Sequence, residues 1–481
     1  MPGNSGSLQA GFTYQELYGW YRVLELKSPS GKVRSVSIED PTAGFFDDVV
    51  VRPAPTTDHR PEYLQVKFHV DVSDLYSSDS LMAETHGLLL RKAWKTWLKL
   101  RDDAQGLELH LISTWAWDPD DPIAPLIRDA RLTRAFVDGT VEGKPAEVRA
   151  LWHKYLERPA EDDFRQFLAS LRLRTGYPAQ SELLGLVKER MEVRGLKHDD
   201  DAAWRGARAV REWMTDRRIE ITEDVLDEAI ERLDLLDAEV EPSVALWVHT
   251  IVPPAETGAD YELDWRDLFE GPEDERGHRM RDSGDWNGRM LTELRAMAAR
   301  INREATDVRL LRLRGKSRLS PWFAVGFAFR ETTGWVLETE QYGTLWRTDL
   351  PASEISLKAS DQALAGPSSA VAVAVSVTGD SSPAVLRYLT SAGDPVARLI
   401  HITVEVPGTR SIGGGGDLTA IAEAVRNSIL TLDERPEDVL LFYWGPATGA
   451  VFIGHALNGV ARRIRLFEEE YGTYSPSITL A

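Results

Sequence analysis

Short apolar segments alternate with amphipathic segments along the last part of the chain, and this alternation limits the folds open to it. The apolar segments cover residues 370–379, 399–404, 438–444 and 464–467. Helical patterns separate them at residues 383–391, 417–432 and 448–459. Strands that alternate with helices predict a parallel sheet, because parallel neighbours need crossover connections. Ligands of such sheets bind beyond the carboxyl ends of the strands.

The whole chain, at 481 residues, is too long for one hydrophobic core, so we expect roughly two to four domains. There is no cysteine, which excludes disulfides and thiolate metal sites and suits a reducing cytoplasm. No apolar run is long enough to cross a bilayer, and the first residues lack the order of a signal peptide. We therefore expect a cytoplasmic protein without a membrane partner.

The first 113 residues read as a compact α/β unit. Helical spacing covers 11–26 and 80–102, and strand patterns cover Val33–Ile38, Asp48–Val51, Tyr63–Val70 and 107–113. From about residue 120 to 235 the pattern is mainly helical, and it turns α/β again from about 243. There we expect a strand at Ala245–Val252, a helix at 284–304 and a hairpin of Trp322–Arg330 with Trp335–Glu340.

A chemical pattern lies on the predicted hairpin of the first unit. Asp48 opens one strand, and Gln65 and Lys67 share a face of the next because side chains alternate along a strand. Asp48, Gln65 and Glu39 supply the oxygen ligands that Mg²⁺ prefers, with Lys67 beside them. A metal-bound water can then attack a phosphodiester while Lys67 stabilises the transition state. A solvated hairpin with no catalytic role is the alternative.

This D…QxK spacing resembles the PD-(D/E)xK, or restriction-endonuclease-like, superfamily. The departure is Gln65 in place of the usual acid, and Glu39 is the candidate for the missing carboxylate. The segment GFTYQ (11–15), followed by the acids and QVK, looks like the nuclease domain fused to bacterial anti-phage effectors. The resemblance implies metal-dependent cleavage of DNA.

Charge argues against tight DNA binding by the chain as a whole. The formal net charge is −20, and residues 1–150 hold 17 Lys and Arg against 22 Asp and Glu. DNA contact therefore needs a local basic patch or several protomers acting together. The segment RKAWKTWLKLR (91–101) offers such a patch. Its tryptophans favour core packing, and its lysines are equally compatible with phosphate contacts and with a solvated face.

The C-terminal motifs resemble the SAVED domain. They are SAVAVAVSVTGD (369–380), VLLFYWGPATGAVFIGHALNGV (439–460) and RLFEEEYGTYSPSITL (465–480), preceded by SRLSPWFAVGFAF (317–329). SAVED domains resemble two CARF-like Rossmann halves fused in one chain. The resemblance implies a receptor for cyclic oligonucleotides in CBASS anti-phage immunity, and a nuclease followed by a SAVED domain implies double-stranded DNA as substrate and self-association on ligand binding.

Several residues near the predicted strand ends are candidates for the ligand pocket. Hydroxyls and backbone N–H groups face ligands there, cations pair with phosphates, and tryptophans stack on bases. The candidates are Lys316, Arg318, Trp322, Trp346, Ser376, Thr378, Gly379, Trp444, Gly445 and Pro446. Core packing is the alternative for each tryptophan, and Trp346 and Trp444 are favoured as functional because they adjoin turns.

The sequence thus predicts an α/β chain of three parts. These are a restriction-endonuclease-like nuclease domain (1–150), a helical connector (151–238) and a SAVED domain (239–481). The expected function is a Mg²⁺-dependent endonuclease that a cyclic oligonucleotide, with a cyclic trinucleotide favoured, activates to cut double-stranded DNA. A catalytically inactive messenger-binding protein that signals through a partner and an RNA-cleaving effector remain as alternatives.

Overall fold

Two compact units, Met1–Pro242 and Ser243–Ala481, make up the chain in a computed structural model. The described residues are 4–55, 57–69, 74–101, 106–216, 220–251, 259–271, 278–341, 343–365, 369–391, 396–470 and 472–481, with side chains from residue 10 onward. Val70, Asp102 and Val252, which the sequence placed at the ends of elements, lie outside this set.

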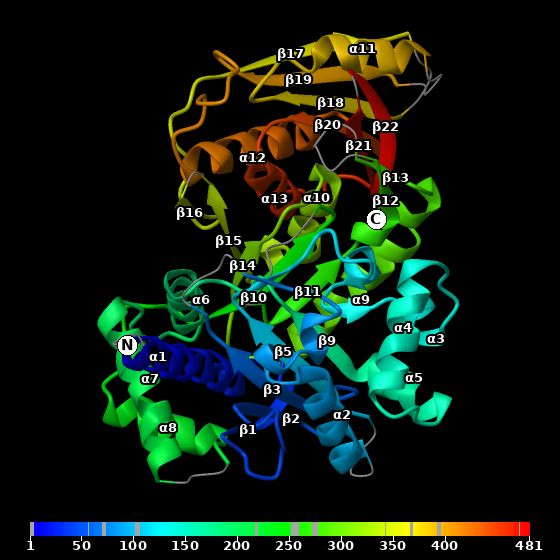
Figure 1. Cartoon of the computed structure of the whole chain (residues 1–481). Helices are drawn as coiled ribbons and strands as arrows, with labels where there is room; N and C mark the ends of the chain where they lie inside the picture. The colour runs from blue at the N-terminus through cyan, green and yellow to red at the C-terminus, as the bar shows by residue number, and fades with distance from the viewer. Residues whose placement is uncertain are drawn as a thin grey trace. The chain divides into compact units, whose positions relative to one another are not determined.

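A mixed sheet forms the centre of the first unit, in the order β1-β2-β3-β5-β9-β8-β7 (Figure 1). Strands β1, β2 and β3 form an antiparallel meander, and β3, β5 and β9 run parallel. The bounds are β1 Val33–Ile38, β2 Val49–Pro53, β3 Glu62–Lys67, β5 Glu108–Ser113, β7 Ile127–Arg128, β8 Arg131–Leu132 and β9 Leu171–Arg174. A small parallel pair, β4 (Leu75–Tyr76) and β6 (Ala116–Trp117), stands apart from this sheet.

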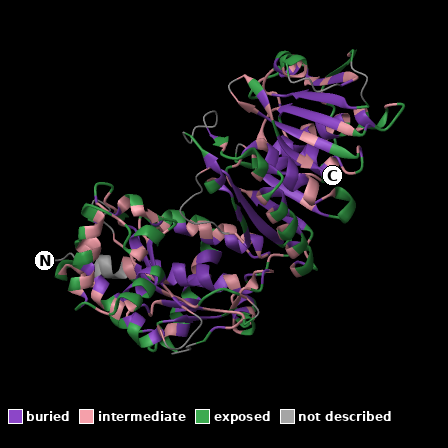
Figure 2. Ribbon diagram, turned by 90° about the vertical axis from the view of Figure 1, so that its right-hand side faces the viewer, coloured by how far each residue is buried: buried purple, intermediate pink, exposed green. Residues whose placement is uncertain are grey.

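Helices cover both faces of this sheet because its strands place apolar side chains on alternate sides. One face packs Val36, Leu64 and Val66 against α1 (Asn4–Val23), α6 (Gln180–Val193), α7 (Asp200–Thr215) and α8 (Glu223–Arg232). The other packs Leu109 and Leu111 against α2 (Leu89–Leu100), α3 (Arg134–Asp138), α4 (Lys144–Tyr155) and α5 (Glu161–Ser170). Figure 2 shows these strands buried and the outer faces of the helices exposed.

The segment expected as a connector, residues 151–238, packs within the first unit. It supplies the end of α4 and all of α5 to one face, strand β9 to the sheet, and α6, α7 and α8 to the other face. Strand β9 reads LRLR, which is too short for its alternation to stand out among helical segments. Helix α1 is buried along the side that α6 and α7 cover, and it needs these helices to complete its packing.

The second unit holds two sheets whose strands repeat one pattern. The first sheet has the order β11-β10-β14-β15-β16, and the second contains β19-β18-β20-β21-β22, with β17 added beside β19. In both, the first four strands are parallel and the fifth pairs antiparallel with the fourth. The chain therefore contains two Rossmann-like halves of equal topology, as the sequence resemblance implied.

The bounds of the strands in the first half are β10 Ser243–His249, β11 Tyr261–Asp264, β14 Leu310–Arg314, β15 Val336–Gln341 and β16 Thr344–Arg347. Those in the second are β17 Leu357–Ala363, β18 Val371–Ser376, β19 Arg398–Val404, β20 Asp438–Trp444, β21 Arg463–Glu470 and β22 Thr473–Leu480. The helices are α9 Arg289–Glu304, α10 Leu319–Ala328, α11 Ser382–Ser391, α12 Gly415–Leu430 and α13 Ala447–Ala456. Strands β12 (Phe269–Glu270) and β13 (Arg279–Met280) form a separate pair.

Helices α10 and α13 join the two halves at very short range. A Cβ on Gly326 would lie 2.2 Å from the Val451 carbonyl oxygen, and one on Gly454 would lie 2.2 Å from that of Phe323. The hairpin expected at Trp322–Arg330 is therefore wrong, because most of this segment forms α10. A short run that is apolar on all sides is equally compatible with a buried helix and a buried strand, and only its packing decides.

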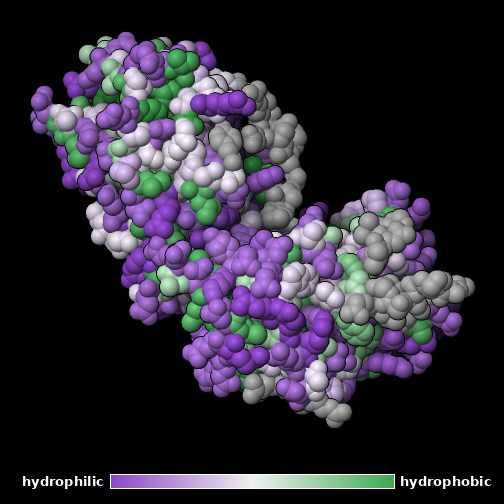
Figure 3. All heavy atoms as spheres, turned by 90° about the vertical axis from the view of Figure 1, so that its left-hand side faces the viewer, coloured by the Kyte–Doolittle hydropathy of each residue, from purple (hydrophilic) through white to green (hydrophobic). Residues whose placement is uncertain are grey.

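None of the helices in the described part of the chain is long and apolar enough to cross a membrane. On the face drawn in Figure 3, hydrophilic residues predominate and apolar residues are scattered in small groups.

Gly206 of α7 tests the packing that holds α1 in place. A Cβ at this position would lie 2.1 Å from the ring of the fully buried Trp20, which cannot move aside. We expect Gly206→Ala to destabilise the first unit by about 1–3 kcal/mol, as overpacked cores do. The matched change Gly185→Ala, on exposed α6 surface with open space around it, should be neutral or stabilise by up to about 1 kcal/mol. Thermal unfolding of both variants checks this, and equal midpoints would refute the packing.

Candidate functional site

The carboxylate of Asp48 lies against strand β3 in the first unit. Asp48 immediately precedes β2, and the antiparallel register pairs Val49 with Leu64, so that Asp48 faces Gln65. The backbone N–H of Val66 donates to Asp48 Oδ2 at 2.6 Å, and the Gln65 amide donates to the same oxygen. The structure thus brings together Asp48 and Gln65, as the predicted hairpin required.

Burial raises the pKa of Asp48 to about 6, although the Val66 N–H and the charge of Lys67 both lower it. Asp47 is half-buried, and burial raises its pKa as well, against the charge of Lys67. Lys67 therefore lies close enough to act on both carboxylates. The site therefore combines the Asp48 carboxylate, whose ionised form burial disfavours, with the neighbouring ammonium of Lys67. A carboxylate of this kind can bind a divalent cation, and an ammonium can bind a phosphate.

Gln15 of α1 is a member of the site that the hairpin pattern did not identify. Its side chain hydrogen-bonds to Asp48 from the helix that covers this face of the sheet. The only signal in the sequence was its place at the end of GFTYQ.

Glu39 lies differently. Its backbone N–H pairs with the Asp48 carbonyl at 3.2 Å, but its side chain is exposed and, among the described residues, makes no hydrogen bond or ion pair with Asp48 or Gln65. Asp47, whose charge acts on Asp48, is a better candidate than Glu39 for a second carboxylate at this site.

The donor set decides whether Mg²⁺ fits here. In the described part of the chain, no group of three or more His, Asp or Glu side chains could hold a metal ion. Asp48 and the Gln65 amide oxygen, once the amide turns from its present bond to Asp48, offer fewer ligands. That number suits Mg²⁺ because it retains several waters and takes one or two carboxylates. A cation there would also stabilise the ionised form of Asp48, which burial disfavours. The residues present therefore fit Mg²⁺ bound mainly by water.

Aromatic residues border this site beyond the end of β3. The imidazole of His69 stacks on Trp115 with centroids 3.6 Å apart, and Tyr76 lies at the edge of both rings. Burial and the charge of Lys67 lower the pKa of His69 to about 4, so the ring is neutral at neutral pH. His69 therefore adds no charge near Lys67.

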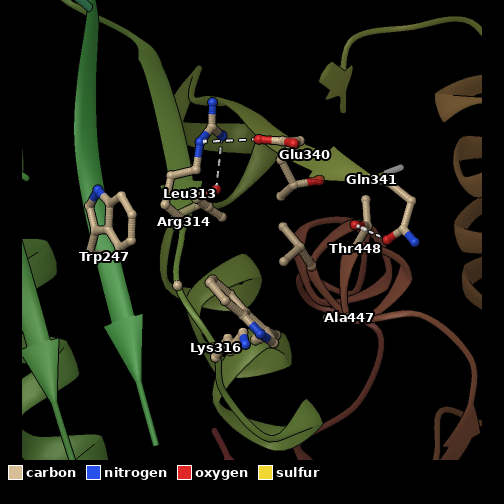
Figure 4. Close-up of a pocket in the computed structure, with 12 residues that line it drawn as sticks. Trp247, Leu313, Arg314, Lys316, Glu340, Gln341, Ala447 and Thr448 are labelled. Atoms are coloured by element: carbon tan, nitrogen blue, oxygen red, sulfur yellow. Dashed lines mark hydrogen bonds and ion pairs between the residues drawn. The ribbon is translucent and has the colours of Figure 1, made fainter. Parts of the chain in front are cut away.

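A cavity of about 620 Å³ opens at the strand ends of the first half of the second unit (Figure 4). Its walls come from the ends of β10, β14 and β15, from α10 and from the first turn of α13. The lining residues are Trp247, Leu313, Arg314, Gly315, Lys316, Trp322, Thr339, Glu340, Gln341, Ala447, Thr448 and Val451. The exposed Lys316 and the α13 N-terminus both favour an anion in this cavity.

Some polar side chains of the cavity already interact with one another. Thr448 donates to the Gln341 side chain at 2.9 Å, and Arg314 lies 3.9 Å from Glu340. Thr339 Oγ1 and Trp247 Nε1 are buried without a partner among the described residues.

Of the ten pocket residues predicted from the sequence, Lys316 and Trp322 line this cavity. Pro446 precedes it as the N-cap of α13. Arg318 is buried and ion-paired with Glu468 at 3.1 Å, and Trp346 is buried in the core of the unit.

The remaining five gather at the strand ends of the second half. Ser376 is buried and bonded to Ser381 and His401. The Thr378 N–H donates to the Trp444 carbonyl at 3.1 Å, Gly379 lies against the Trp444 ring, and Gly445 lies against Tyr443.

The raised pKa of Asp48 predicts the sign of a stability change in metal-free buffer. Above pH 6 the partly buried carboxylate is ionised in the folded state, where ionisation is less favourable than in the unfolded chain. Asp48→Asn should therefore maintain or raise the unfolding temperature at neutral pH, and the difference should vanish as pH falls below the usual value of 3.8.

Glu62 provides the control of opposite sign. Burial raises its pKa, but the charges of Arg22, His110 and Arg174 outweigh burial and hold it at about 2. Glu62→Gln should therefore lower the unfolding temperature at neutral pH, and this stabilisation should be lost only in acid. Thermal unfolding across a pH series measures both, and a drop for Asp48→Asn like that for Glu62→Gln would contradict the assignment.

Comparison with known proteins extends these observations. Residues 293–480 match the SAVED model, the SMODS-associated and fused to various effectors sensor domain. CD-NTase-associated protein 4 of Enterobacter hormaechei subsp. hoffmannii (strain UCI 50) is 25% identical over 475 residues, covering 92% of this chain and 91% of the relative. The protein of the same name from Moraxella osloensis is 25% identical over 226 residues, 46% of each chain.

Solved structures agree with the fold. An Acinetobacter baumannii Cap4 SAVED/CARF-domain containing receptor with the cyclic trinucleotide 3′3′3′-cAAA has a TM-score of 0.53 at 14% identity, covering 98% of both chains. The same receptor with 2′3′3′-cAAA has a TM-score of 0.51. Residues 293–480 of this chain are therefore a SAVED domain, in a protein homologous to CD-NTase-associated protein 4 over most of its length.

Proposed function

We propose that this chain is a CBASS effector whose first unit is a Mg²⁺-dependent endonuclease for double-stranded DNA, activated by a cyclic oligonucleotide bound in the second unit. The observation that carries the nuclease is the meeting of Asp48, Gln65 and Lys67 at the joined ends of β2 and β3. Homology to CD-NTase-associated protein 4 supports an effector role for the whole chain.

The site residues have separate tasks in phosphodiester hydrolysis. Asp48 and the Gln65 amide oxygen would hold Mg²⁺, and Gln15 and the Val66 N–H fix the Asp48 carboxylate in place. When bound, Mg²⁺ lowers the pKa of a coordinated water and offsets phosphate charge. Lys67 orients the attacking water and stabilises the negative charge that develops on the phosphate oxygens in the transition state.

The cavity of the second unit supports the sensor. The related receptors carry cyclic trinucleotides in their structures, and the cavity here offers an ammonium, a helix N-terminus and a buried tryptophan. Such groups bind a phosphate-linked ring of bases. We infer that ligand binding drives self-association, which pools the weak basic surface of several first units and lets a chain of net charge −20 bind DNA.

Cleavage assays test the nuclease. Purified protein is incubated with Mg²⁺ and either plasmid DNA or RNA, alone and with a panel of cyclic di-, tri- and tetranucleotides. We expect loss of DNA only with an activating ligand, and about a 10²–10³-fold slower rate for Lys67→Ala, as for the loss of a transition-state donor. Lys144→Ala, at the exposed start of α4, is the matched control and should cut like the wild type.

The two alternatives are outcomes of the same assay. Loss of RNA but not DNA would make the chain an RNA-cleaving effector. Ligand binding without any cleavage would leave a messenger-binding protein that signals through a partner, with Gln65 in place of an acid as the physical reason.

Lys316 and Arg318 separate ligand binding from folding. Lys316 is exposed in the cavity, so Lys316→Ala should weaken binding of 3′3′3′-cAAA by about 10–100-fold, the value of a charge-assisted hydrogen bond, without changing the unfolding temperature. Arg318→Ala leaves Glu468 buried and unpaired and should destabilise the second unit by about 3–5 kcal/mol. Calorimetric titration and thermal unfolding measure the two effects. Unchanged binding by Lys316→Ala would remove this cavity as the ligand site.

A further inference from the structure

Phe45 brings a second lysine to the nuclease site. It lies in the turn between β1 and β2, shortly before Asp47 and Asp48. The Lys67 ammonium lies 5.4 Å from the centroid of its ring, and the Lys92 ammonium of α2 lies 4.7 Å from the same centroid. Two cations from different elements therefore share one aromatic ring at the edge of the site.

Contacts between the turn and α2 hold this arrangement. The Phe45 N–H donates to the Thr96 hydroxyl at 3.0 Å, one turn of α2 beyond Lys92. Gly44 has a φ of +73° and lies so close that a Cβ there would be 2.9 Å from the same hydroxyl. Phe46 is buried in the core that α2 covers. Lys92 is thus set at a defined place relative to Asp47 and Asp48.

The other cations of α2, and Arg101 directly after it, either contact other residues or make no contact with Phe45. Arg91 packs over the Tyr155 ring at 4.6 Å, and Arg101 pairs with Asp163 at 2.8 Å. Lys95 and Lys99 are exposed and have no ring contact with Phe45 among the described residues. Lys92 is also exposed, and in the described part of the chain it makes no ion pair that would neutralise it.

Two ammonium groups held near one ring form a small positive patch on an acidic chain. Phosphates of one DNA strand recur about every 3.4 Å along the helix axis, and the two distances to Phe45 keep the ammonium groups within about 10 Å of each other. A single strand that places one phosphate at Lys67 therefore carries neighbouring phosphates within reach of Lys92.

From this geometry we propose that Lys92 binds a backbone phosphate of DNA beside the phosphate that is cut, and so positions the strand across Asp48 and Lys67. The inference rests on the proposed nuclease function and identifies where its substrate lies. Lys92 is a positioning residue, because it is tied to the site through Phe45 and does not contact Asp48. The basic face of α2 divides accordingly, with its start serving DNA and its later lysines solvated.

Salt-dependent DNA binding tests this directly. Fluorescence anisotropy follows a short labelled duplex in Mg²⁺-free buffer with the activating member of the cyclic nucleotide panel, over a salt titration. Each lost phosphate contact lowers the slope of log K against log salt by about 0.9. We expect that loss, with weaker binding, for Lys92→Ala, full slope for Lys95→Ala one turn away, and recovery in Lys92→Arg. The unfolding temperatures of all three should match the wild type.

The outcomes separate the two proposals. Equal slopes for Lys92→Ala and Lys95→Ala, whether both are reduced or both unchanged, would overturn the assignment of Lys92. A wild type that binds the duplex but does not cut DNA with Mg²⁺ would refute the nuclease alone, and the slopes would still decide on Lys92. A wild type that neither binds nor cuts would overturn both.

Discussion

The hydrogen bond from the Val66 N–H to the partly buried carboxylate of Asp48 is the contact on which the first unit's chemistry depends. It joins the residue before β2 to β3 and favours the ionised carboxylate, but burial outweighs it and raises the pKa of Asp48 to about 6. Helix α1 reaches the same oxygen pair through Gln15, and α2 reaches the neighbouring turn through Thr96 and Phe45. Helix α1 thus contacts the carboxylate itself, and α2 fixes the turn that precedes it.

In the second unit, two halves of the same topology build the candidate ligand cavity. In the first half, α10 follows the end of β14, and in the second half, α13 follows the end of β20. These two helices meet at Gly326 and Gly454. This close crossing brings the first turn of α13, from one half, into the wall of a cavity at the strand ends of the other. A ligand in that cavity would contact both halves, so its binding is sensitive to how the halves pack.

Local pattern predicted much of this structure. Alternation and turn residues predicted β1, β2 and β3, and with them the approach of Asp48 to Gln65, because hairpin register is a local property. In the second half, periodicity also predicted the order from β18 to β21, but β17 and β22 were not predicted.

Tertiary contacts decided the rest. Residues 319–328 are mainly apolar, and their packing against α13 and the neighbouring elements accompanies a helix that the pattern did not predict. Residues 151–238 look like independent helices until β9 enters the sheet and α6 and α7 enclose α1. The sequence pattern also did not predict which way individual side chains point. The buried ion pair of Arg318 depends on Glu468, which is far away in the sequence.

The proposed chemistry of the first unit requires Asp48 and Gln65 to hold one divalent cation beside Lys67. Anomalous scattering from crystals grown with Mn²⁺ in place of Mg²⁺ would show whether they do. We expect a single anomalous peak in the first unit, bonded to Asp48 and to the Gln65 amide oxygen, with the amide turned from its present bond. A Gln65 amide that still donates to Asp48 at saturating Mn²⁺, with no peak beside it, would refute the metal site.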